Sequence, residues 1–144
     1  MLLLLIVSSM LCTFIVYGDS SDNNSKQTLG QASSTEAVRG TYLSEGTAEI
    51  SKLSSDEVHL LGVTDCVRTS DKVYLYLYLE QKVNGAYGTY RTWKFTKQNA
   101  DALAKGIDVL VPSGYYYRLR GYHAAECNGT KESVGTCTSG VWVD

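Results

Sequence analysis

The stretch VYLYLYLEQK, residues 73–82, decides the fold that this sequence predicts. Val73, Leu75, Leu77 and Leu79 share one parity, and Tyr74, Tyr76, Tyr78, Glu80 and Lys82 share the other. Successive side chains of a β-strand point to opposite faces of its sheet. The alternation therefore predicts a strand with a buried aliphatic face and an outer face of tyrosines and charges.

The segment GYYYRLRGYH, residues 114–123, divides in the same way. One parity holds Tyr115, Tyr117, Leu119, Gly121 and His123, and the other holds Tyr116, Arg118, Arg120 and Tyr122. In TYRTWKF, residues 89–95, Trp93 and Phe95 share a side and leave Tyr90, Thr92 and Lys94 opposite. The three segments predict one amphipathic sheet, with apolar side chains inward and with tyrosines and cations outward.

Period-two patterns continue along the chain and predict about seven strands. We expect them near residues 40–52, 57–69, 72–83, 88–96, 107–111, 115–126 and 134–143. Asn84-Gly85 and Asn128-Gly129 are the strongest turn signals between them, and the single proline, Pro112, also lies between strands. The one helical candidate is the short segment 97–105. The predicted fold class is all-β, a single antiparallel β-sandwich.

Residues 1–18 form an apolar run that ends abruptly at Asp19. This run predicts a secretory signal peptide, and a membrane anchor is the alternative because about 18–20 apolar residues can cross a bilayer. Residues 19–38 contain no aromatic side chain and predict a disordered linker. The β-sandwich domain is then residues 39–144. The protein is predicted to be secreted or, with the anchor retained, to face the outside of the cell.

The predicted domain is electrically balanced. Residues 39–144 carry 12 lysines and arginines and 12 aspartates and glutamates, so the net charge is 12 − 12 = 0. Phosphate backbones are bound by surfaces with an excess of positive charge. The composition therefore argues against nucleic acid as a partner, and a membrane partner is expected only if residues 1–18 are retained.

Three cysteines follow the apolar run, and secretion would place them in an oxidising environment. If Cys127 lies opposite Cys137 across the last hairpin, Tyr122 pairs with Trp142, and both sulfurs share the parity of the core-facing residues. This agreement favours a Cys127–Cys137 disulfide, with Cys66–Cys127 and Cys66–Cys137 as the alternatives. Cys66 would then be a buried free thiol, which is usually inert.

Two resemblances add to this interpretation. The segments VPSGYYYRLRGYHAAECNGTKES (111–133) and TCTSGVWV (136–143) resemble the last two strands of a fibronectin type III or immunoglobulin-like domain. Residues 39–144 also resemble a family of small exported proteins of Clostridia-type Gram-positive bacteria. That resemblance rests on Gly-Tyr-Tyr-Tyr-Arg-x-Arg-Gly-x-His at 114–123, on Glu132-Ser133 and on Thr138-Ser139-Gly140. Together they imply export and an immunoglobulin-like sandwich, but no activity.

The outer face of tyrosines and arginines is the candidate binding site. Its residues are Tyr74, Tyr76, Tyr78, Arg118, Arg120, Tyr122 and Trp142. Tyrosine offers rigid contact area with a polar tip, and a guanidinium can clamp an anion or stack on a ring. We expect a non-catalytic module that binds an unknown protein or glycan at the cell surface. The structural alternative is that tyrosine and arginine only stabilise each other across neighbouring strands.

The sequence contains no recognisable catalytic motif. His59 and His123 match no zinc-ligand spacing, and the carboxylates form no convergent pair. We predict no catalytic residue, no metal and no cofactor. A small secreted hydrolase or inhibitor with a site on its loops, and a structural protein of the cell envelope, are the alternative functions.

Overall fold

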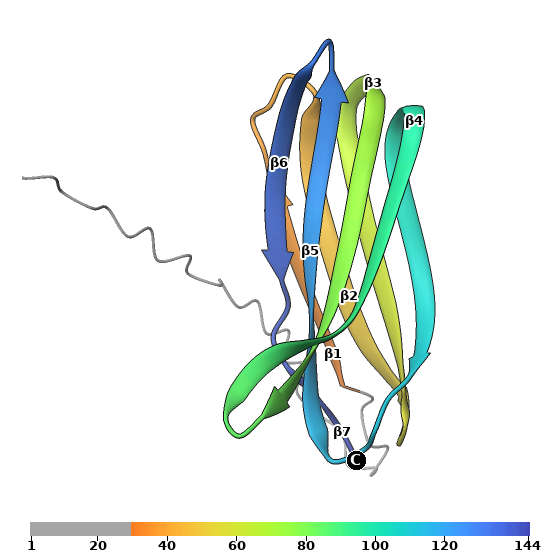
Figure 1. Ribbon diagram of the computed structural model, residues 1–144, viewed down its shortest axis with the longest axis vertical. Helices are drawn as coiled ribbons and strands as arrows, with labels where there is room; N and C mark the ends of the chain where they lie inside the picture. Colours follow the sequence, from red (N-terminus) through yellow and green to blue (C-terminus); the bar gives the residue numbers. More distant parts are fainter. Residues whose placement is uncertain (1–29) are drawn as a thin grey trace, which may run out of the picture.

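The structure, a computed structural model, describes residues 30–144 and is built from β-strands alone over that range (Figure 1). The predicted signal peptide or anchor, residues 1–18, lies outside the described residues. The strands are β1 (Gln31–Ala37), β2 (Leu43–Ser54), β3 (Glu57–Val83), β4 (Ala86–Leu110), β5 (Tyr115–Cys127), β6 (Thr130–Cys137) and β7 (Val141–Val143). All neighbouring strands pair antiparallel, which confirms the predicted all-β antiparallel class.

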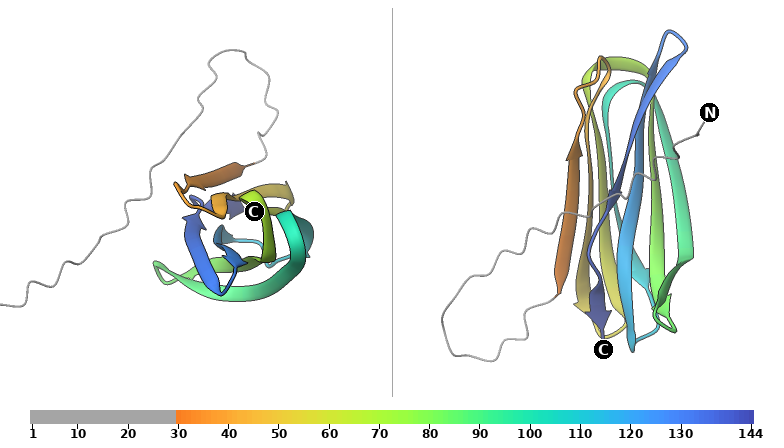
Figure 2. Two further views of the ribbon diagram at one scale, coloured as in Figure 1. Left: turned by 90° about the horizontal axis from the view of Figure 1, so that it is seen from above. Right: turned by 90° about the vertical axis from the view of Figure 1, so that its left-hand side faces the viewer.

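The seven strands form one continuous sheet that curls over itself, because β3 and β4 are long enough to run through both of its halves. The first half contains β1, β2, residues 57–66 of β3 and residues 102–110 of β4. The second half contains residues 70–83 of β3, residues 86–100 of β4, and β5 to β7. Seen from above, the two halves face each other (Figure 2). An immunoglobulin-like arrangement is not confirmed, since the halves are one hydrogen-bonded sheet.

The predicted breaks inside β3 and β4 are not chain turns. Strand pairing continues through Ser70 and Gly106, and the expected helix at 97–105 is part of β4. The sheet bends there instead: the β3–β4 register shifts between Asp65 and Ser70, and Asn99 takes a left-handed φ of 48°. Polar residues at these positions mark a bend in a two-stranded ribbon, which short-range sequence signals do not distinguish from a turn.

The first strand lies within the predicted linker. Residues 31–37 pair with β2, so the folded domain begins before residue 39, and this part of the predicted disordered linker 19–38 is ordered. The strand lacks an apolar pattern because it lies at the edge of the sheet and most of its side chains are small. Ala32 is its buried residue. Backbone hydrogen bonds to β2, rather than hydrophobic burial, account for most of its attachment.

The predicted core parity is confirmed in both central strands. Leu75, Leu77 and Leu79 of β3 are fully buried, as are Tyr117 and Leu119 of β5. Trp93 and Phe95 are half-buried and pack against the same core. The core therefore lies between the two halves of the curled sheet, where the aliphatic faces of both meet.

A polar group sits inside this core, at His123 of β5. Its Nδ1 lies 3.0 Å from Thr64 Oγ1, and its Nε2 lies 2.9 Å from Thr136 Oγ1, so both ring nitrogens have hydroxyl partners. The backbone opposite has no side chain: a Cβ at Gly46 of β2 would overlap the imidazole ring. Glycine at position 46 lets the two halves close over the ring.

A second polar contact joins the outer edges of the two halves. The backbone N–H groups of Thr41, Tyr42 and Leu43, before and at the start of β2, donate to the Glu132 carboxylate of β6 at 2.8–2.9 Å. These donors favour the ionised form and hold the pKa of Glu132 below its usual value. Glu132 thus ties β6 of the second half to the chain that enters the first.

The predicted Cys127–Cys137 disulfide is wrong. Cys127 lies opposite Thr130 and Cys137 opposite Arg120, so seven residues of β5 separate the two positions. Seven residues of strand span about 23 Å, whereas disulfide-linked Cα atoms lie about 4.4–6.8 Å apart. The two-residue turn at Asn128-Gly129, where both residues have positive φ, sets this register.

The same register corrects the predicted pairing of the last strand. Trp142 of β7 lies opposite Tyr116 rather than Tyr122. No disulfide joins cysteines within residues 30–144, which also removes the two alternatives involving Cys66. Cys66 is a half-buried free thiol, and burial raises its pKa.

Gly46→Ala should lower the free energy of unfolding by about 1–3 kcal/mol, because the added methyl group overpacks the core against His123. Gly88→Ala is the matched control, since Gly88 also lies in a strand and no atom lies within 4 Å of a Cβ built there. The control should stay within about 0.5 kcal/mol of the parent protein. Urea unfolding followed by fluorescence measures both, and equal stabilities would contradict the packing argument.

His123 should make stability depend on pH. Burial lowers its pKa from 6.5 to about 4, so the unfolded chain binds the proton more readily than the folded one. Its contribution is complete above the unfolded pKa and is lost as the pH falls toward the folded value. We expect the free energy of unfolding to fall by about 2 kcal/mol between about pH 7 and about pH 5 from this group.

His123→Gln keeps hydrogen-bonding atoms at this position but does not titrate, so it should remove that part of the pH dependence. Urea unfolding at each pH, for the parent and the variant, isolates the histidine from the other acidic groups. If the free energies of unfolding of the parent and the variant changed with pH in parallel, His123 would have the same pKa in the folded and unfolded states, and the prediction would be wrong.

Candidate functional site

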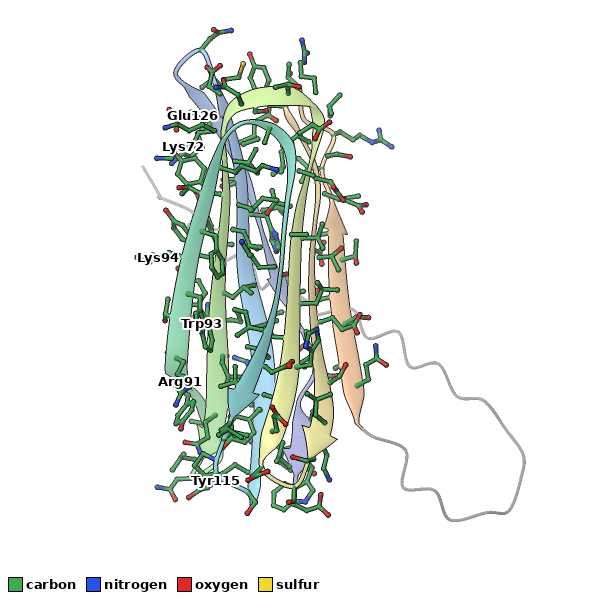
Figure 3. All side chains as sticks on the ribbon, turned by 90° about the vertical axis from the view of Figure 1, so that its right-hand side faces the viewer. Lys72, Arg91, Trp93, Lys94, Tyr115 and Glu126 are labelled. Atoms are coloured by element: carbon green, nitrogen blue, oxygen red, sulfur yellow. The ribbon has the colours of Figure 1, made fainter. Side chains whose placement is uncertain are left out.

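The outer side of the second half carries all seven predicted binding residues, together with cations that the prediction did not include. We call this surface the basic face. It consists of Lys72, Tyr74, Tyr76, Tyr78, Glu80 and Lys82 of β3, Tyr87 and Lys94 of β4, Tyr116, Arg118, Arg120, Tyr122 and Glu126 of β5, Lys131 of β6 and Trp142 of β7. In Figure 3, Lys72, Lys94 and Glu126 project from one side of the molecule, and Trp93 lies nearer the core.

The strand register places these side chains in rows across the sheet. Tyr76 lies opposite Lys94 on one side and Tyr122 on the other, and the two tyrosine rings are 5.3 Å apart. Tyr78 lies opposite Arg120, whose guanidinium is 5.4 Å from the ring centre. Each row therefore pairs a cation with an aromatic ring, an arrangement that stabilises both and restricts their movement.

Lysines extend the same pattern toward both ends of the face. The Lys131 ammonium lies 4.1 Å from the centre of the Tyr74 ring, and Lys72 lies 4.9 Å from it. At the other end, Lys82 lies 5.6 Å from the ring of Tyr87 and 5.9 Å from the ring of Tyr116. The lysines are thus held at the surface by their cross-strand neighbours.

One carboxylate organises the two arginines. Arg118 Nε donates to Glu80 Oε2, and Arg120 Nε donates to Glu80 Oε1 at 2.7 Å. The Glu80 side chain is only 6% exposed, whereas those of Arg118 and Arg120 are 29% and 45% exposed. The acid therefore lies beneath its two partners, and each guanidinium has further N–H groups besides the one that Glu80 accepts.

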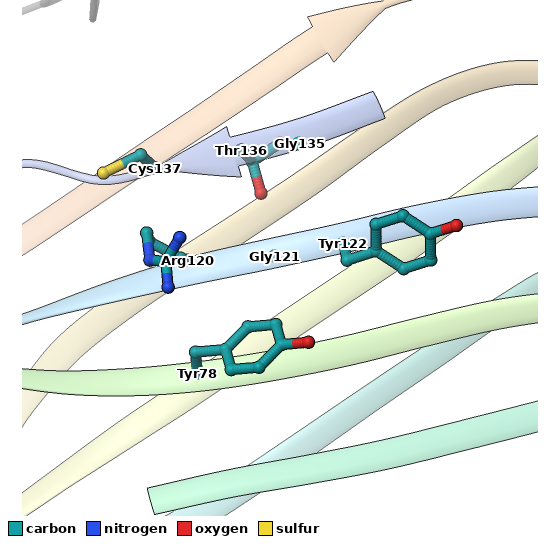
Figure 4. Close-up of a pocket in the computed structure, with 7 residues that line it drawn as sticks. All are labelled: Tyr78, Arg120, Gly121, Tyr122, Gly135, Thr136 and Cys137. Atoms are coloured by element: carbon teal, nitrogen blue, oxygen red, sulfur yellow. The ribbon is translucent and has the colours of Figure 1, made fainter. Parts of the chain in front are cut away.

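A hollow of about 400 Å³ opens in the basic face between β3, β5 and β6 (Figure 4). Its lining residues are Tyr78, Arg120, Gly121, Tyr122, Gly135, Thr136 and Cys137. Gly135 lies opposite Tyr122 and supplies no side chain, and the nearest atom to a Cβ built there is 3.7 Å away. The missing side chain leaves room beside the Arg120 guanidinium and the two tyrosine rings.

The structure brings together some of the predicted site residues and separates others. Tyr78, Arg120 and Tyr122 line the hollow, and Tyr76 packs on Tyr122 beside it. Trp142 is packed on Tyr116, with 5.0 Å between the ring centres, at the β7 end of the face. The prediction missed Glu80 as the partner of both arginines, although alternation had already placed it on the same side.

Charge is strongly segregated between the two outer faces. The basic face has six lysines and arginines against two glutamates. The outward positions of the first half have no lysine or arginine but five carboxylates, those of Glu45, Glu49, Glu57, Asp65 and Asp108. The net charge of zero over residues 39–144 therefore conceals a basic and an acidic surface, so composition alone does not decide whether polyanions bind.

Between residues 30 and 144, no group of three or more His, Cys, Asp or Glu side chains could hold a metal ion. Over the same range no helix is long and apolar enough to cross a membrane. His59 Nδ1 lies 2.5 Å from Asp108 Oδ1 on the acidic outer face, in an exposed pair.

The fold and the site define an all-β domain with a cationic, aromatic sheet face and a shallow hollow within it. The chain belongs to a family of unknown function, DUF6147, whose model matches residues 11–141. No curated protein sequence matches it.

Among solved structures, the chain is similar to the sporulation control protein Spo0M of Bacillus subtilis, with 12% sequence identity and a TM-score of 0.41. The similarity covers 78% of this chain and 49% of that one, so the chain spans about half of the length of Spo0M.

Replacing Arg118 and Arg120 together by glutamine should destabilise the fold by about 3 kcal/mol, because the nearly buried Glu80 carboxylate then lacks a cationic partner. Adding Glu80→Gln to this double variant should recover most of the loss, since the unpaired charge is removed. Lys94→Gln with Lys131→Gln removes as much charge at exposed positions and should leave the free energy of unfolding nearly unchanged. Urea unfolding measures all three, and a triple variant no more stable than the double variant would contradict this account.

Proposed function

We propose that this protein is a non-catalytic, exported binding module that contacts a glycan or a protein through its basic face. Export is inferred from the apolar run at residues 1–18. The domain would then present the basic face outside the cell, whether the apolar run is removed or retained as an anchor.

The hollow lined by Tyr78, Arg120 and Tyr122 is the observation that carries this proposal. Phenol rings offer apolar area with a hydrogen-bonding tip, and a guanidinium offers several directed donors beside them. A sugar ring or a planar side chain can therefore find both stacking and polar contacts in one place. A small, open hollow on the outer side of a sheet suits contact rather than the enclosure that most catalysis needs.

The side chains of the hollow are held in place before any ligand arrives. Tyr122 packs on Tyr76, Arg120 is fixed by Glu80, and Tyr78 lies under the Arg120 guanidinium. Ordering a free side chain on binding costs about 0.5–1.5 kcal/mol, and contacts formed in advance reduce that cost. The cross-strand stabilisation of this face is thus compatible with a role in binding and favours it.

Tyr78→Ala with Tyr122→Ala should abolish retention of the protein on an array of cell-surface glycans and surface extracts, because both ring surfaces of the hollow are removed. The matched control is Tyr42→Ala with Tyr115→Ala, which removes two tyrosines that do not line the hollow. Thermal unfolding of each variant checks that the fold persists. Retention of the first variant at the level of the control would exclude the hollow as the binding site.

A further inference from the structure

The charge pattern of the basic face specifies its ligand more closely than the proposed function, on which this inference rests. We propose that the ligand is a linear polyanion, an extended polymer with phosphate or carboxylate groups, that lies along the strands of the basic face. Lys72, Lys82, Lys94, Arg118, Arg120 and Lys131 are the cations, and Glu80 and Glu126 are the only acids among its residues.

The cations are distributed along the whole face rather than gathered at one point. Lys72 and Lys82 are ten residues apart on β3, which corresponds to about 33 Å of strand. The face is four strands wide between β4 and β6, or about 14 Å. A small anion would use one end of such a surface, whereas a polymer parallel to the strands can contact cations along its full length.

The two acids of the face do not block a polyanion. Glu80 lies beneath Arg118 and Arg120 and is almost buried, so a ligand meets the guanidinium groups first. Glu126 lies near one end, where it accepts a hydrogen bond from the Tyr74 hydroxyl at 2.7 Å and lies 3.9 Å from Lys131. Between these acids, the rows of Tyr76 with Lys94 and of Tyr78 with Arg120 contain no acidic residue.

The acidic outer face of the first half supports a single binding orientation. Its five carboxylates repel a polyanion, so only the basic face is available to one. The acidic face of a second copy is also complementary in charge, but stacking opposite faces of identical chains does not close and leads to open fibres. A polyanionic polymer neutralises the cations of the basic face without producing fibres, and it is therefore the favoured partner.

Binding of the full chain to long-chain polyphosphate, to polygalacturonate and to neutral dextran tests this inference. We expect binding to at least one of the two polyanions and none to dextran. If about four cations are neutralised, affinity should fall roughly 50-fold between about 50 and about 200 mM salt, a log–log slope near −3. Binding to polyphosphate alone or to polygalacturonate alone supports the inference equally and identifies the anionic group.

Lys94→Gln with Lys131→Gln should reduce the salt slope by about half, because two of the contacting cations are lost. Arg39→Gln with Lys105→Gln removes the same charge from positions outside the basic face and should leave the slope unchanged. Equal losses in both variants, or salt-independent binding, would overturn the inference, as would self-association without polyanion binding. Retention on neutral glycans that depends on Tyr78 but not on the lysines would overturn it while leaving the proposed function intact.

Discussion

The structure depends on one strand packing against itself. The first half of β3 brings Gly62 against Leu75 and Leu77 of its own second half, and a Cβ built at Gly62 would lie 2.6 Å from a Leu77 methyl group. This contact is possible only because the β3–β4 ribbon bends near residues 66–70 and because position 62 has no side chain. Once the ribbon has folded over, β2 and β5 pair with its two halves and bury the remaining aliphatic rows between them.

The fold-over also determines the two outer surfaces. The outward residues of the two halves lie on opposite sides of the molecule. Charged residues of a single strand that runs through both halves, such as β3, therefore reach opposite sides. Asp65 and Lys72 are seven positions apart in β3, yet they belong to the acidic and the basic face. Opposite charges on the two outer faces attract each other only weakly, because dissolved salt screens interactions between exposed charges that lie far apart. Residues 39–144 carry no net charge, yet they can therefore present a strongly cationic surface.

Much of the fold and part of the site could be predicted from alternation alone. The parity of residues 73–82 and 114–123 correctly assigned the buried leucines and His123, and it placed most of the tyrosines and arginines on the outer side. It failed for Tyr74, which is buried beneath Lys72 and Lys131, and for Tyr115, which was expected in the core and is exposed. The cysteine pairing failed because shared parity is compatible with many registers, whereas the Asn128-Gly129 turn permits one. The lysines of the site were missed for a related reason, since Lys94 and Lys131 belong to other strands. Lys94 lies beside Tyr76 only because β4 pairs with β3, and Lys131 lies beside Tyr74 only because β6 pairs with β5.

By itself the sequence determined which side of the central strands β3 and β5 is buried, because the two-residue period of an extended chain acts locally and does not depend on which strands are neighbours. It also determined the tight hairpins, since Asn-Gly at two positions fixes the backbone of the turn. Only the tertiary structure decided that β3 and β4 bend rather than end, that β1 joins the sheet, and that cations and rings from four strands form one face. Those outcomes depend on contacts between residues far apart in the chain. Such contacts stabilise the protein only once the sheet has closed.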